Sequence, residues 1–128
     1  MKYIYFLQIA CDEDQHESIS AILNTQSTNS RLNSWELRLV EQETDPPIYF
    51  IDYFLNLLEG KYDELSRIGI ERRYISVWMY YEYDNQCNIE FAPEDMKRLG
   101  EEGITLCISC WENPDWEPPD DEENSKTS

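Results

Sequence analysis

The fold is decided by the stretch from Tyr74 to Trp111, which reads YISVWMYYEYDNQCNIEFAPEDMKRLGEEGITLCISCW. Its first ten residues combine four tyrosines and a tryptophan with isoleucine, valine and methionine. Aromatic and β-branched side chains fit the pleated, half-buried surface of a sheet, so residues 74–83 are predicted to form a strand. The segments predicted to follow are a turn (84–86), a short strand (88–91), a helix (93–100) and a last strand (104–111).

Side chains alternate across a strand, which divides the predicted strand at 74–83 into two faces. The face predicted to build the core carries Ile75, Val77, Met79 and Tyr81, together with Leu106 and Ile108 of the last strand. The opposite face carries Trp78 and Tyr80, with Trp111 beside them on the last strand. These three aromatic side chains are therefore expected to face a partner rather than the core.

Two more strands and two helices are predicted before this stretch. Residues 3–10 are apolar on nearly both faces, which favours a central strand. Residues 34–42 alternate, and this pattern predicts that Trp35 points inward and that Glu36 points outward. A helix is predicted between these strands. Apolar residues at helical spacing then continue from residue 48 through Gly60, which predicts one long helix with a kink at the glycine.

The sequence therefore predicts an α+β fold over residues 1–111. It consists of a single, mostly antiparallel sheet of four main strands, with one long and two shorter helices on one face. The predicted order is strand, helix, strand, helix, strand, short strand, helix, strand. Residues 112–128 are acidic and rich in proline, so they are predicted to form a tail outside the core.

Charge is the dominant feature of the composition, with 27 Asp and Glu against 10 Lys and Arg and a net charge of −17. A body this acidic repels phosphate backbones and anionic lipid, so neither nucleic acid nor a membrane is an expected partner. It attracts a basic protein. The alternative is that the charge serves solubility alone. The first residues lack a small-residue cleavage site after their apolar run, which predicts a cytoplasmic protein.

Cysteine spacing offers one motif, the C-x-x-C of Cys107 and Cys110. Both lie in a predicted strand, where residues three apart point to opposite faces. A redox pair is typical of a helix start, and a zinc site needs further ligands. The cysteines are therefore predicted to be reduced, structural thiols.

The sequence predicts no catalytic residue, no metal site and no cofactor, and the chain is expected not to be an enzyme. The single histidine, His16, lies among acids that suit the N-terminus of a helix. A hydrolase that uses Glu82, Asp84 and Glu90 is the enzymatic alternative. Acids at a strand end are more often a solvated edge, and geometry rather than residue count defines an active site.

The chain resembles the DUF4279 family of small bacterial domains from about Tyr3 to Trp111. The resemblance rests on Trp35, on the long amphipathic helix, and on the run NIEFAPEDMKRLGEEGITLCISCW after a tyrosine-rich strand end. Ala92 departs from the family pattern, in which a hydroxyl side chain caps the helix. The family has no established activity, so the resemblance implies a fold and little chemistry.

Aromatic side chains flanked by acids are typical of interface hot spots. The predicted partner-binding residues are Glu36, Trp78, Tyr80, Glu82, Asp84, Trp111, Asp115 and Trp116. Together with the acidity, they suggest a non-enzymatic protein-binding domain, namely an immunity or antitoxin-type inhibitor of a basic bacterial toxin such as a nuclease. The alternatives are a small-ligand or regulatory domain, with a pocket between the long helix and the sheet, and a homodimeric scaffold. The aromatic side chains could instead be covered by the C-terminal tail or, in a homodimer, by a second copy.

Overall fold

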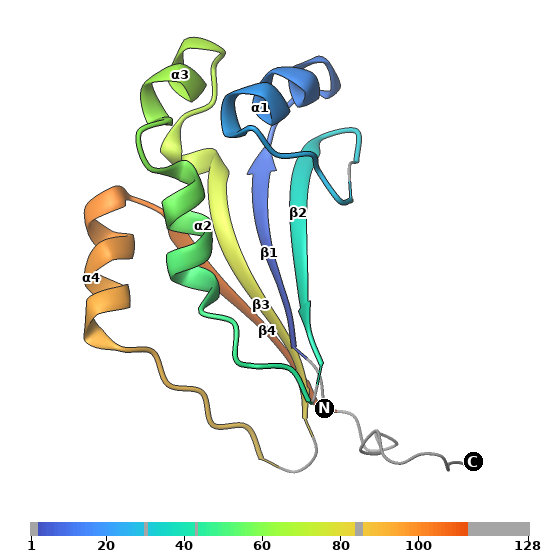
Figure 1. Ribbon diagram of the computed structural model, residues 1–128, viewed down its shortest axis with the longest axis vertical. Helices are drawn as coiled ribbons and strands as arrows, with labels where there is room; N and C mark the ends of the chain where they lie inside the picture. Colours follow the sequence, from blue (N-terminus) through green and yellow to red (C-terminus); the bar gives the residue numbers. More distant parts are fainter. Residues whose placement is uncertain (1–2, 30, 43, 84–85, 113–128) are drawn as a thin grey trace.

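The computed structural model describes residues 3–29, 31–42, 44–83 and 86–112, and it contains one open sheet with helices packed against one face (Figure 1). The strands are β1 (Tyr3–Ala10), β2 (Ser34–Glu41), β3 (Ile75–Tyr83) and β4 (Thr105–Glu112). The helices are α1 (His16–Leu23), α2 (Phe50–Leu58), α3 (Tyr62–Arg67) and α4 (Pro93–Glu102), with short 3-10 turns η1 (Glu13–Gln15) and η2 (Arg72–Tyr74). The predicted α+β class is confirmed.

The four strands follow the order β2-β1-β3-β4. β1 runs antiparallel to β2 and β3, whereas β4 runs parallel to β3. The chain passes through α4 between β3 and β4, because parallel neighbours need a crossover connection that brings the chain back along the sheet. The predicted single, mostly antiparallel sheet is therefore confirmed.

The inner face of the sheet is the face that the helices cover. Figure 1 shows α2 and α4 lying along the sheet, with α1 and α3 gathered at one end of it. Leu7 of β1 and Val77 of β3 are completely buried, as are Phe54 and Leu58 of α2. The inward face predicted for β3 is confirmed, since Ile75, Val77, Met79 and Tyr81 are all buried.

Ile108 was predicted to join this core, but 40% of its surface is exposed. β4 lies at the edge of the sheet and has only β3 as a neighbour. A side chain on an edge strand has fewer neighbours, even when the alternation along the strand points it to the inner face. Ile104, which directly precedes β4, is buried instead.

The long helix predicted to run through Gly60 is two helices, α2 and α3. Gly60 has a φ of +77°, which a right-handed helix cannot contain, and Glu59 before it is extended. The apolar spacing misled the prediction because both helices bury residues in the same core, including Leu55 of α2 and Leu65 of α3. In the described part of the chain, no helix has the length and hydropathy needed to cross a membrane.

The short strand predicted at residues 88–91 is absent, since the described residues 86–92 have no regular secondary structure. β3 already pairs with β1 on one edge and with β4 on the other, so no edge of β3 is left for a hairpin partner. Ile89 and Phe91 nevertheless pack against the core, which accounts for the alternation that predicted a strand.

The last described residue is Glu112, which ends β4. The tail predicted to begin at this residue therefore contributes Glu112 to the sheet. Residues 113–128 lie outside the described part of the chain.

Candidate functional site

The outer face of the sheet is the candidate binding surface, because the described helices all pack on the inner face (Figure 1). Its residues are Ile4, Phe6, Gln8 and Ala10 of β1, Ser34, Glu36, Arg38 and Val40 of β2, Ser76, Trp78, Tyr80 and Glu82 of β3, and Thr105, Cys107, Ser109 and Trp111 of β4. The strand register places these residues in rows that cross the sheet.

The central row consists of Arg38, Phe6, Trp78 and Cys107. The rings of Phe6 and Trp78 are stacked, with centroids 5.4 Å apart, and the Arg38 guanidinium carbon lies 5.5 Å from the Phe6 ring centroid. Trp78 Nε1 donates a hydrogen bond of 2.9 Å to the hydroxyl of Ser76. The two stacked rings therefore form a flat aromatic surface, and the indole N–H already has a hydrogen-bond acceptor.

The next rows continue this surface toward the end of β4. Val40 is 42% exposed, and it lies in the same row as Ile4 and Tyr80. The Tyr80 hydroxyl donates a hydrogen bond of 2.7 Å to Glu82, and this bond raises the pKa of Tyr80, with a smaller contribution from burial. Glu82 pairs in register with Trp111, which is 59% exposed. Trp78, Tyr80, Glu82 and Trp111 thus lie together on one face, as predicted.

Glu36 was predicted to contact a partner, but only 3% of it is exposed. It lies on the outer face, but its carboxylate accepts hydrogen bonds from Gln8 Nε2 (3.1 Å) and Asn29 Nδ2 (3.3 Å) and forms an ion pair with Arg38 (3.5 Å). The backbone N–H groups of Thr28 and Asn29 also donate to the Glu36 carbonyl. The loop before β2 therefore folds over this residue, which stabilises the fold and offers no contact to a partner.

Three predicted partner-binding residues, Asp84, Asp115 and Trp116, lie outside the described residues. Of the acids predicted to surround the aromatic surface, the described chain exposes Glu82 in part and buries Glu36. The described surface is therefore more aromatic and less acidic than the sequence indicated.

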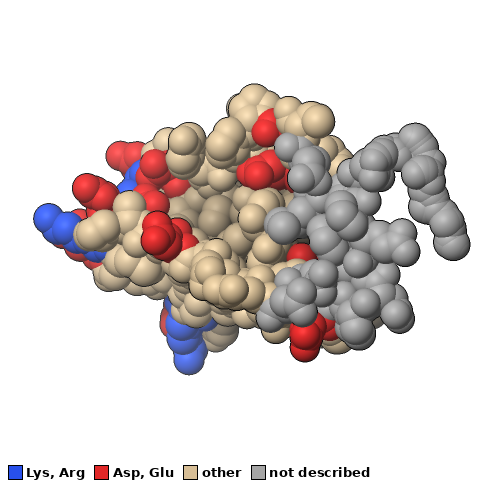
Figure 2. Space-filling view, turned by 90° about the horizontal axis from the view of Figure 1, so that it is seen from below, with Lys and Arg blue, Asp and Glu red and all other residues tan. Residues whose placement is uncertain are grey.

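A small cavity of about 190 Å³ opens between the start of α2, residues 89–91 and the sheet. Its apolar lining includes Tyr5, Phe50, Met79 and Phe91, and the acidic residues Asp52, Glu90 and Asp95 also line it. Figure 2 looks at this end of the molecule and shows a hollow in the surface with Asp and Glu side chains around it. Burial raises the pKa of Asp95, and the nearby charge of Asp52 adds to the shift. A pocket between the long helix and the sheet belonged to the small-ligand alternative, but the residues that line this cavity could not be predicted because they come from segments far apart in the chain.

A second hollow, of about 700 Å³, lies along α1 and the loop after it. It is lined mainly by polar residues, among them His16, whose Nε2 atom is buried and has no hydrogen-bond partner in the described structure. Within the described ranges, no group of three or more His, Cys, Asp or Glu side chains is arranged to hold a metal ion.

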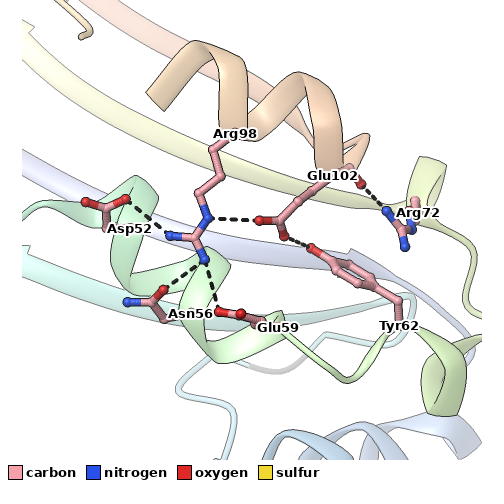
Figure 3. A network of polar contacts seen from close by, with 7 residues as sticks. All are labelled: Asp52, Asn56, Glu59, Tyr62, Arg72, Arg98 and Glu102. Carbon is pink, nitrogen blue, oxygen red and sulfur yellow. Dashed lines mark hydrogen bonds and ion pairs between the residues drawn. The ribbon is translucent and has the colours of Figure 1, made fainter. Parts of the chain in front are cut away.

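Arg98 of α4 is the centre of a polar network that the sequence did not predict (Figure 3). Its guanidinium contacts Asp52 (3.3 Å), Asn56 (2.8 Å) and Glu59 (3.4 Å) on the α2 side, and Glu102 (2.9 Å) on its own helix. Glu102 also accepts a hydrogen bond of 2.5 Å from the Tyr62 hydroxyl, while its carbonyl accepts one from Arg72. The network joins α4 to α2 and α3, so we interpret it as structural.

Comparisons of the chain with models of known protein families, with curated proteins and with solved structures found no match. The resemblance to the DUF4279 family therefore stays a prediction.

Proposed function

We propose that this protein is a non-enzymatic binding domain whose outer face docks a basic protein. In this proposal it acts in the cytoplasm as an immunity or antitoxin-type inhibitor of a basic bacterial toxin such as a nuclease. The observation that carries the proposal is the aromatic surface formed by Phe6, Trp78, Tyr80 and Trp111, which none of the described helices covers.

Aromatic side chains held on a sheet suit a binding surface because little conformational entropy is lost when they are covered. Phe6 and Trp78 already restrain one another by stacking, and Trp78 is further held by its bond to Ser76. Interface hot spots are enriched in Trp and Tyr and lie where water is excluded. We expect Trp78 and Trp111 to make the largest contributions to the binding free energy.

The net charge of −17 supports a basic partner. Since Glu36 is buried, the charge acts on this face mainly through the field of the whole molecule. Such a field raises the association rate and weakens as salt screens it. The proposal therefore assigns the fast encounter to the overall charge and the slow dissociation to the aromatic surface.

Co-purification from the native host tests the proposal, with the tagged full chain at low salt and a Trp78→Ala/Trp111→Ala variant beside it. A basic protein should accompany the wild-type chain, and its recovery should fall about tenfold or more with the variant. Tyr53→Ala is the matched control, because Tyr53 is 49% exposed on α2, on the helical side of the sheet. Elution of the wild-type chain alone, or equal recovery with the tryptophan variant, contradicts the proposal.

A homodimer through the outer face is the competing explanation of the same surface. Light scattering distinguishes the two. A wild-type mass of two chains that returns to one chain in Trp78→Ala/Trp111→Ala supports the homodimer, whereas a monomeric wild-type chain supports an external partner.

The cavity beside α2 favours a second candidate function, binding of a small organic cation. Its volume of about 190 Å³ lies below the ~300 Å³ of a typical ligand pocket, so it admits only a few heavy atoms. Asp52 and Asp95 would pair with the cationic group while Phe50 and Met79 contact the apolar part. Short primary alkylamines should then raise the melting temperature of the wild-type chain but not of Asp95→Asn, and equal shifts in both would reject this candidate.

A further inference from the structure

Two cysteines from different segments lie next to each other at the end of the sheet. Cys87 is in the irregular segment after β3, and Cys110 is near the end of β4. Their Sγ atoms are 3.0 Å apart, although the residues are 23 positions apart in the chain. A disulfide has an S–S distance of about 2.05 Å, so an approach of about 1 Å would bring the two sulfurs to bonding distance.

The surroundings of the pair allow this approach. Residues 86–92 have no regular secondary structure, so the backbone at Cys87 is not held in a strand or helix. Cys110 is exposed, which gives a small oxidant access to its sulfur. Its partner is half-buried and packs against the core beside it.

We propose that Cys87 and Cys110 are a redox modification site, at which a reversible disulfide fastens residues 86–92 to β4. The oxidant is a low-molecular-weight disulfide such as glutathione disulfide. The Cys110 thiolate attacks one sulfur of glutathione disulfide, which forms a mixed disulfide and releases one glutathione thiolate. The Cys87 thiolate then attacks the Cys110 sulfur and releases the second glutathione, so the two protein thiols lose two electrons and the glutathione disulfide gains them. The two protons from the protein thiols pass to the released thiolates.

The disulfide has a structural consequence, because the segment it fastens forms one wall of the cavity beside α2. Ile89, Glu90 and Phe91 line the cavity and follow Cys87 closely in the chain. Fixing Cys87 to β4 restrains this wall. Oxidation therefore sets the rigidity of the cavity, whether or not the outer face binds a protein.

The other two cysteines are built-in controls. Cys107 lies on the same strand as Cys110, but on the outer face, where its row contains Trp78. Cys11 follows β1, away from β4 in the strand order. All four cysteines are free thiols in this structure.

Reduced full-length protein is incubated with glutathione and glutathione disulfide at rising ratios of the disulfide and at low protein concentration. Thiols are then counted under denaturing conditions, and non-reducing peptide mapping by mass spectrometry identifies the linked residues. We expect the count to fall from four to two per chain, a Cys87–Cys110 peptide pair, and a raised melting temperature.

The same result is expected for Cys11→Ser and for Cys107→Ser, whereas Cys87→Ser and Cys110→Ser should show neither the intramolecular link nor the thermal shift. Peptide mapping of the wild-type chain needs no substitution, so it shows which cysteines are linked even if a variant fails to fold. A Cys107–Cys110 link, a link between chains, or glutathione adducts without an intramolecular disulfide would each overturn the proposal.

Discussion

Trp35 and Trp78 lie on opposite faces of the same sheet, and their environments show how differently the two faces are used. Trp35 points to the inner face, is completely buried, and donates a hydrogen bond of 2.9 Å to Ser20 of α1. Trp78 points to the outer face, is only partly buried, and bonds to Ser76 on its own strand. Both faces carry large aromatic side chains, so what separates them is the helical layer rather than the residue type.

The inner face therefore holds the fold, whereas none of the described helices covers the outer face. Replacing a residue on the inner face opens a cavity beneath helices that cannot fully collapse into it. On the outer face the same replacement removes stacking and partial burial but leaves no enclosed void. Matched substitutions on the two faces test this division.

The largest effect is expected from the two tryptophans. Trp35→Ala should lower the free energy of unfolding by about 3–5 kcal/mol, because it removes a fully buried ring. Trp78→Ala should cost about 1 kcal/mol, which is the usual value of an aromatic pair such as Phe6 with Trp78. Urea denaturation measures both, and equal losses would show that the outer face is part of the core.

The second comparison uses two glutamates that share the outer face. Glu36→Gln should cost about 2 kcal/mol. The new amide NH₂ group would face the NH₂ group of Gln8 or Asn29 in a buried site, and two donors cannot bond to each other. Glu82→Gln should change the stability by about 0.5 kcal/mol or less, since Glu82 is more exposed and glutamine keeps an acceptor for Tyr80. Chemical denaturation of the two variants distinguishes them, and a neutral Glu36→Gln would contradict its structural role.

The third comparison tests the helical layer itself at two glycines. Gly60→Ala should lower the free energy of unfolding by about 1–2 kcal/mol, because alanine is strained at a φ of +77°. Gly100 lies within α4 and has open space around it, so Gly100→Ala should raise the stability by about 0.5–1 kcal/mol. Thermal denaturation gives both signs, and a stabilising Gly60→Ala would mean that α2 and α3 can merge into one helix.

The alternation of residues along β3 was enough to predict which of its side chains face the helices. It predicted the buried positions of Val77 and Met79 and the outward positions of Trp78 and Tyr80. Alternation is a local property of the strand, and it holds wherever one face is covered.

Alternation could not predict how exposed each outward residue is, because exposure depends on segments distant in the chain. Glu36 points outward as predicted, but the loop that contains Asn29 folds over it. Spacing likewise could not reveal the break at Gly60, since apolar residues keep the same rhythm on both sides of it. The contact between Cys87 and Cys110 depends on the register of β4 beside β3, which no local pattern determines.

The smallest effect is expected from two tyrosines, one on each face. Tyr5 on the inner face donates a hydrogen bond of 3.0 Å to Glu41, which also accepts one from the N–H of Ile48. Tyr5→Phe should cost about 1 kcal/mol, the usual net value of a hydrogen bond. Tyr80→Phe on the outer face should cost about 0.5 kcal/mol or less, because Tyr80 and Glu82 are both only partly buried, whereas Tyr5 is buried.

The pH dependence sharpens the same comparison. Burial, followed by the hydrogen bond to Glu41, raises the pKa of Tyr5 well above its usual range, so the folded chain retains a proton that the unfolded chain releases near pH ~10. The stabilisation that comes from the raised pKa of Tyr5 is therefore complete below about pH 10, and it is lost as the pH rises toward the pKa of Tyr5 in the folded chain. Burial also raises the pKa of Tyr62, so the Tyr5→Phe variant should still lose some stability as the pH rises. Urea titrations between about pH 8 and pH 11 should show a shallower loss in Tyr5→Phe than in the wild-type chain, and nearly the wild-type slope in Tyr80→Phe. Identical slopes in all three would mean that the inner face protects the Tyr5 phenol no better than the outer face protects Tyr80.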